Sequence, residues 1–139
     1  MKNIIIDTSV IVKLLNDQLE QHVKQANKVL LDAQKNKISI FAPELSRYEI
    51  GNAILKKKLS MPFAQDTLET AYDLPIQFVK ETYKLACKTY EIAAKTNMTY
   101  YDASFIALAK QESAILVTDN IKHQGKTSEV KVIPLAEYK

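Results

Sequence analysis

The stretch TYYDASFIALA, residues 99–109, points to a buried helix and places an acid where that helix needs an apolar residue. Phe105, Ile106 and Ala109 recur at the spacing of one helix face. Asp102 precedes them by three, four and seven residues, so it lies on the same face. A carboxylate at the head of an apolar stripe has either a capping role or a functional one, because its burial is otherwise costly.

Helical and strand-like segments alternate on both sides of this stretch. We expect strands at residues 3–7, 37–42, 73–78, 114–118 and 130–135, of which 73–78 is an edge strand because it contains a proline. Before the helix that carries Asp102, we expect helices at residues 10–15, 20–36, 44–58, 61–72 and 80–96, the first of them capped by Thr8 or Ser9. This alternation predicts an α/β fold around a mostly parallel sheet, with a single domain over residues 1–139.

Composition narrows the classes of function. The chain has 139 residues, 47% of them hydrophobic and 25% charged, as in an ordinary globular protein. It has no apolar run long enough to span a membrane and no clear signal peptide, so we expect a cytoplasmic protein. Two distant glycines cannot form a phosphate-binding loop, and two histidines with one cysteine cannot form a usual zinc site. A metal-free ribonuclease that uses His22 and His123 as acid and base remains open.

Four acids lie in apolar surroundings, three of them at the ends of the expected elements and one within a helix. Asp7 follows the first strand, Asp119 follows AILVT, and Glu49 borders the apolar face of the helix at 44–58. Each can be a turn, cap or paired residue, as can Asp102. Functional groups of parallel sheets collect at the carboxyl ends of the strands, however, and acids that converge there repel one another. An all-oxygen set without histidine or cysteine indicates Mg²⁺ or Mn²⁺ as the ion that relieves this repulsion.

Four segments, in order along the chain, resemble the motifs of PIN-domain nucleases of the VapC toxin type. They are IIIDTSVIVK, LSRYEIGNAI, TYYDASFIALA and AILVTDN. One position departs from the family pattern, in which the fourth acid stands two residues after the threonine. Counted from Thr118 that position is Asn120, and Asp119 comes one residue early. The fourth position is filled either by Asp119, through a local shift of the chain, or by Asn120, through its amide oxygen or a water.

The resemblance implies a three-layer α/β/α sandwich with a mostly parallel sheet and an Mg²⁺- or Mn²⁺-dependent endoribonuclease, the toxin of a toxin–antitoxin pair. Its partners would be RNA, a cognate antitoxin and a second copy of the chain. Lys13 and the lysines at 56–58 are expected to attract the RNA backbone. The alternatives are an RNA-processing PIN nuclease without a toxin role, or a degenerate PIN module that only binds RNA. The residues expected to hold metal and catalyse are Asp7, Glu49, Asp102 and Asp119, supported by Ser9, Asn52, Thr118 and Asn120.

The helix at 44–58 has apolar side chains on two sides. The stripe expected to face the domain interior consists of Leu45, Tyr48, Leu55 and Leu59. Ile50 and Ile54 then lie on the opposite side, and we expect them to form a homodimer surface. In the alternative arrangement, residues 61–72 fold over these isoleucines within one chain.

Overall fold

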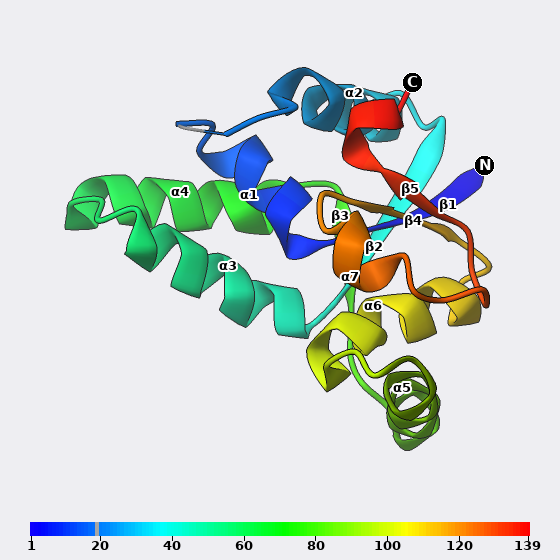
Figure 1. The fold of residues 1–139 in the computed structure, drawn as a ribbon. Coiled ribbons are helices and arrows are strands. Elements are labelled where there is room, and N and C mark those ends of the chain that lie inside the picture. Colours follow the sequence, from blue (N-terminus) through cyan, green and yellow to red (C-terminus); the bar gives the residue numbers. More distant parts are fainter. Residues whose placement is uncertain (19) are drawn as a thin grey trace.

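Five parallel strands form one sheet with helices on both faces in the computed structural model, which describes residues 1–18 and 20–139 (Figure 1). The strands are β1 (Lys2–Ile6), β2 (Ile38–Pro43), β3 (Ile76–Val79), β4 (Ile115–Thr118) and β5 (Val132–Pro134). The helices are α1 (Thr8–Leu15), α2 (Val23–Gln34), α3 (Leu45–Lys56), α4 (Met61–Asp73), α5 (Tyr83–Thr96), α6 (Tyr100–Gln111) and α7 (Ile121–Gln124), followed by the 3₁₀ turn η1 (Leu135–Glu137). The predicted α/β/α sandwich is confirmed, and the sheet is wholly parallel among the described strands.

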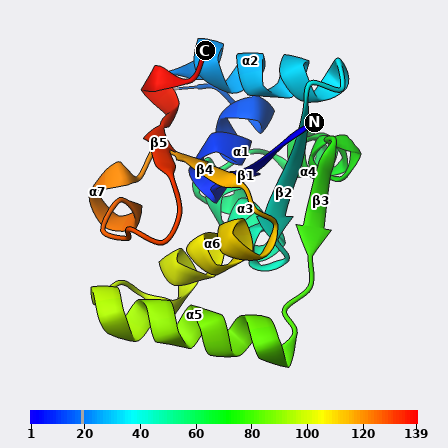
Figure 2. The same cartoon turned by 90° about the vertical axis from the view of Figure 1, so that its right-hand side faces the viewer.

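The core lies on both faces of the central strand β1. Ile4 and Ile6 pack with α1, α2, α3 and α4, whereas Ile5 packs with α5 and α6, because successive strand residues point to opposite faces. All three isoleucines are fully buried, which explains why this strand is apolar without alternation. Figure 2 shows the resulting layers, with α5 and α6 below the sheet and α1 and α2 above it.

The strand order β3-β2-β1-β4-β5 creates a crevice at the carboxyl ends of β1 and β4. The chain leaves β1 toward β2 on one side, and it later crosses from β3 to β4 on the other side of β1. Connections that diverge in this way leave an opening above the strand ends, where ligands of such sheets bind.

The predicted elements are confirmed with small shifts of their ends. The helix expected from residue 20 begins at Val23, the edge strand begins at Ile76 after Pro75, and α7 forms within the segment expected to be a loop. The helix expected from residue 10 is capped by Asp7, rather than by Thr8 or Ser9. None of the described helices is both long and apolar enough to cross a membrane.

The orientation predicted for α3 is wrong. Ile50 and Ile54 are each only 2% exposed, whereas Tyr48 and Leu55 are 78% and 75% exposed. The isoleucines share a core cluster with residues of α1 and with Ala71 of α4, which agrees with the alternative that residues 61–72 cover them. They therefore do not form a dimer surface. With apolar residues on both sides of α3, periodicity alone could not select the face that packs against its neighbours.

Candidate active site

A cavity of about 220 Å³ lies beyond the carboxyl ends of β1 and β4 and contains three of the four predicted acids. Asp7 comes from the end of β1, Glu49 from α3 and Asp102 from the first turn of α6. The fourth acid, Asp119, is not among the lining residues. The complete lining is Asp7, Thr8, Ser9, Glu49, Asp102, Phe105, Asn120 and Gln124.

Asp7 is the buried acid of this cavity, and its side chain is fixed by donors on both oxygens. Its Oδ1 accepts from the Ser9 hydroxyl over 2.5 Å and from the Val10 amide over 3.2 Å, which makes Asp7 the N-cap of α1. Its Oδ2 accepts from the Thr118 hydroxyl of β4. Burial nevertheless raises the pKa of the Asp7 carboxyl above its usual value, and the negative charge of Asp119 adds to the rise. These donors lower the pKa without offsetting the loss of water.

Thr118 connects Asp7 to the segment that follows β4. Its oxygen accepts from the Asn120 amide over 2.8 Å and lies 2.6 Å from the side-chain amide of Gln124. The group that faces Thr118 is Gln124 Oε1, an acceptor, so the single hydroxyl proton of Thr118 has two acceptors, Asp7 Oδ2 and Gln124 Oε1, and is donated to one of them at a time. Ser9 and Thr118 thus both contact Asp7, and the buried Gln124 is a further residue of this network that the sequence did not suggest.

Glu49 is held by α1. The Thr8 hydroxyl donates to Glu49 Oε1 over 2.6 Å and lies 3.3 Å from the Ser46 hydroxyl. The second carboxylate oxygen of Glu49 has no hydrogen bond to any residue that the structure describes. Thr8 was expected only as a helix cap, and its link to Glu49 depends on two helices that are 41 residues apart in sequence.

Asp102 stands in the first turn of α6, where Thr99 supplies the cap. The Thr99 hydroxyl accepts from the Asp102 amide over 3.0 Å. The reciprocal bond of a capping box, from Asp102 back to the Thr99 amide, is not among the contacts of the described residues. The Asp102 carboxylate is therefore available to the cavity while α6 remains capped.

Asp119 and Asn120 diverge at the end of β4. The Asp119 carboxylate lies 3.1 Å from Lys13 Nζ and 3.3 Å from His22 Nδ1, whereas Asn120 lines the cavity. The Lys13 side chain is only 4% exposed and also pairs with Glu20, so the role expected for it in attracting RNA is wrong. Asn52 is exposed on α3 and does not line the cavity.

The sequence-family model of the PIN domain matches residues 4–127 of this chain, a range that includes every acid of the cavity. The chain belongs to the PIN domain family. No curated protein sequence matches this PIN domain.

Solved structures resemble this PIN domain over almost its whole length. VapBC2 from Rickettsia felis, bound to a DNA fragment from its promoter, matches with a TM-score of 0.74 and 18% identity, over 95% of this chain and 98% of that one. FitAcB from Neisseria gonorrhoeae matches with a TM-score of 0.69 and 17% identity, over 96% and 99%. VapC20 of Mycobacterium tuberculosis, a sarcin-ricin loop cleaving toxin, matches with a TM-score of 0.62 and 14% identity, over 81% and 86%. At these identities the likeness establishes the fold.

The donors of the cavity fit a hard divalent cation by their chemistry. They are carboxylate, hydroxyl and side-chain amide oxygens, without sulfur or imidazole. Within the described part of the chain, no three acidic, histidine or cysteine side chains lie close enough together to enclose an ion by themselves. Mg²⁺ does not need such an enclosure, because it keeps several waters and is usually bound by one or two carboxylates together with substrate phosphate.

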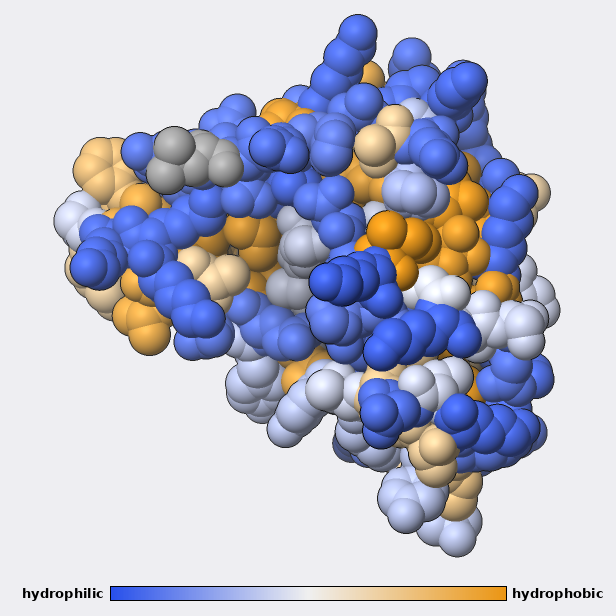
Figure 3. Space-filling model, viewed as in Figure 1, coloured by the Kyte–Doolittle hydropathy of each residue, from blue (hydrophilic) through white to orange (hydrophobic). Residues whose placement is uncertain are grey.

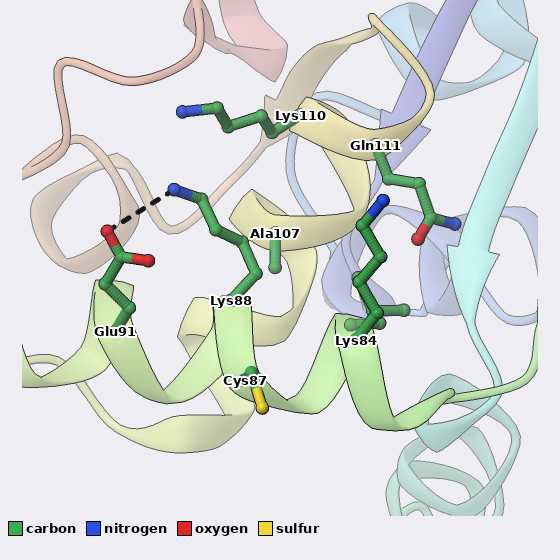
Figure 4. A pocket seen from close by; sticks show the side chains of 8 residues that line it. Lys84, Cys87, Lys88, Glu91, Ala107, Lys110 and Gln111 are labelled. Carbon is green, nitrogen blue, oxygen red and sulfur yellow. Dashed lines mark ion pairs between the residues drawn. The ribbon is translucent and has the colours of Figure 1, made fainter.

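A larger hollow of about 510 Å³ lies between α5 and α6, and most of its charged residues are lysines (Figure 4). Lys84, Lys88 and Lys110 border it, and Lys88 pairs with Glu91 at 3.6 Å. Lys110 lies eight residues beyond Asp102, about 12 Å along the axis of α6. Volume therefore does not identify the candidate active site; the convergence of acids from three separate elements does.

Proposed function

We propose that this PIN domain is an Mg²⁺- or Mn²⁺-dependent endoribonuclease and the toxin of a toxin–antitoxin pair. The observation that carries the proposal is the arrival of Asp7, Glu49 and Asp102 from three separate elements in one cavity. Asp7 is buried there at the cost of a raised pKa, which a bound cation would reverse. A purely structural role for the three acids would not explain why they lie together in one cavity.

Each residue has a role in the proposed reaction. Asp7 and Asp102 hold the cation, and the Asn120 amide occupies the fourth position that the sequence left open between Asn120 and Asp119. The cation supplies positive charge that offsets the charge developing on the phosphate in the transition state. Asp119 keeps the buried Lys13 paired and so acts from outside the cavity.

Glu49 is the general base in this proposal. With Oε1 held by Thr8, its other oxygen orients a water and takes a proton from it. The water oxygen bonds to phosphorus in line with the P–O3′ bond, which breaks, and the leaving 3′-oxygen takes a proton from solvent. The products are a 5′-phosphate and a 3′-hydroxyl, because the 2′-hydroxyl is not the nucleophile.

A protein partner is supported by a separate surface. Large apolar side chains are exposed at the tip where α3 meets α4, and apolar groups stand among polar ones there (Figure 3). They include Leu55, Met61 and Phe63, which are 75%, 67% and 68% exposed. Exposed apolar patches of this kind mark interaction sites. We assign this surface to the antitoxin, since solved relatives include toxin–antitoxin complexes, and we place both proteins in the cytoplasm with the RNA. A homodimer is part of the same proposal.

The test is cleavage of a mixed single-stranded RNA pool with Mg²⁺ or Mn²⁺, compared with EDTA. We expect cleavage only with the ion and a loss of at least about 100-fold in Asp102→Asn. Since Thr99 caps α6 by itself, this variant should remain folded. Glu91→Gln, on the exposed side of α5, is the matched control. Metal-independent cleavage that requires His22 or His123 would instead favour the histidine mechanism, and RNA binding without cleavage would favour a degenerate module.

A further inference from the structure

A second hollow, of about 330 Å³, adjoins the candidate active site and is lined by tyrosines and carboxylates. Tyr48 of α3 and Tyr100 and Tyr101 of α6 contribute the rings, and Glu44 and Glu81 contribute the acids. We call this set the tyrosine hollow. The ends of β2 and β3 form its floor through Pro43 and Val79, so it opens on the same edge of the sheet as the catalytic cavity.

The two hollows share the helices that carry the catalytic acids. On α3, Tyr48 lines the tyrosine hollow and the next residue, Glu49, lines the catalytic cavity. On α6, Tyr101 and Asp102 divide in the same way. The tyrosine hollow therefore lies within reach of a polymer held in the catalytic cavity.

The tyrosine hollow suits a flat group with N–H donors better than it suits phosphate. Tyr48 and Tyr101 are 78% and 60% exposed, so their rings offer free faces. Among the described residues that line it, none is lysine or arginine, and its charges are negative. Aromatic faces stack on unpaired bases of single-stranded nucleic acid, and carboxylates accept hydrogen bonds from base N–H groups.

The two carboxylates differ in availability. Glu81 Oε1 accepts from the Tyr100 hydroxyl over 2.5 Å, and this bond raises the pKa of Tyr100 to about 12, so the hydroxyl stays protonated. The Glu44 carboxylate has no hydrogen bond or ion pair to any part of the chain that the structure describes. Glu44 thus has both oxygens ready for a ligand.

We propose that the tyrosine hollow binds one unpaired guanine of the RNA, with Tyr48 and Tyr101 stacking on the base and Glu44 accepting from it. This deepens the proposed function and rests on it. Guanine fits best because its N1–H and its 2-amino group are adjacent donors, which match the two oxygens of one carboxylate. Uracil has a single N–H on that edge. The enzyme then cuts next to guanosine in single-stranded RNA.

The first test needs neither metal nor cleavage. Guanosine, inosine and uridine are titrated separately into the protein in EDTA, with binding followed by saturation-transfer NMR. We expect guanosine to bind at least fivefold more tightly than inosine, which lacks the 2-amino group, and than uridine. Tyr101→Ala should weaken guanosine binding about five- to one-hundred-fold, whereas Tyr101→Phe should retain it. Glu44→Gln should remove the difference between guanosine and inosine. Tyr90→Ala, at an exposed tyrosine outside the hollow, is the control.

The second test is the cleavage pattern of a random-sequence RNA with Mg²⁺. We expect wild type to cut next to guanosine, and Glu44→Gln to cut without that preference while its thermal response to Mg²⁺ is unchanged. Equal binding of the three nucleosides, or unchanged guanosine binding by Tyr101→Ala, overturns the proposal. A Tyr48→Ala variant that changes its sedimentation but not its guanosine binding assigns the hollow to a protein partner and also overturns it. A wild type that binds guanosine but cuts no RNA contradicts only the nuclease function.

Discussion

The Thr8 hydroxyl donates a 2.6 Å hydrogen bond to Glu49 Oε1 and thereby joins α1 to α3 in the lining of the candidate active site. Thr8 follows Asp7 directly, so the turn that buries one acid also positions another. Supporting hydrogen bonds of this kind fix the orientation of a carboxylate, and their loss commonly lowers activity 10- to 100-fold, as an order of magnitude.

Thr8→Val should lower kcat by roughly tenfold, because Glu49 loses the donor that holds Oε1 while the shape of the side chain is kept. Thr8→Ser keeps the hydroxyl and should restore most of the rate. Steady-state cleavage of a fluorescent RNA measures both variants. An unchanged rate in Thr8→Val, or an equal fall in Thr8→Ser, would contradict the role of the hydrogen bond.

Asp7→Asn should stabilise the metal-free protein at neutral pH. Because burial raises the pKa of folded Asp7, the stability that its protonated form contributes is present below the ordinary value of 3.8 and is lost as the pH rises through the folded pKa. Asparagine removes the buried charge and keeps a good N-cap. A gain of about 1 kcal/mol corresponds to a rise in Tm of roughly 2–4 °C. Melting curves in EDTA from pH 4 to 8 should converge at low pH and separate as the pH rises; parallel curves would contradict the pKa direction.

Mg²⁺ or Mn²⁺ at millimolar concentration should raise the Tm of wild type, because an ion that binds only the folded state stabilises it by mass action. Asp7→Asn should lose most of this rise, since it removes a charged ligand. Glu91→Gln, on a solvated face of α5, should respond like wild type. An equal loss in both variants would mean that the ion acts on the surface charge in general.

Asp119 and Asn120 should have separable effects. Asp119→Asn removes one of the two carboxylates that pair with the buried Lys13, so it should lower the free energy of unfolding by about 1–2 kcal/mol. Asn120→Ala should reduce cleavage at least tenfold with little change in stability, because its side chain lines the cavity. Denaturant titration and the RNA assay measure the two quantities. The reverse pattern would assign the fourth catalytic position to Asp119.

Ile54→Ala should destabilise the domain by about 2–5 kcal/mol, the usual cost of a cavity at a fully buried isoleucine. Leu55→Ala, one residue later and exposed, should change stability by less than about 0.5 kcal/mol. Urea unfolding of both variants checks the burial of α3. Comparable losses would mean that Leu55 is covered by a partner in solution.

Local sequence determined the order of elements and the parallel sheet. The apolar run before Asp7 predicted a strand buried on both faces, and Phe105, Ile106 and Ala109 predicted the buried face of α6. The acids at strand and helix ends were equally visible, and the family resemblance was confirmed by the match to the PIN domain. Their catalytic roles remain predictions.

Sequence patterns did not determine how α3 is rotated, or which residue after Thr118 enters the cavity. Side chains on both sides of α3 satisfied the helical period, and only packing against α1 and α4 selected Ile50 and Ile54 for burial. Asp119 turns to Lys13 because a buried ammonium ion needs a counter-charge, and this leaves Asn120 facing the acids. Both outcomes depend on groups far apart in the chain, so the tertiary structure alone decided them.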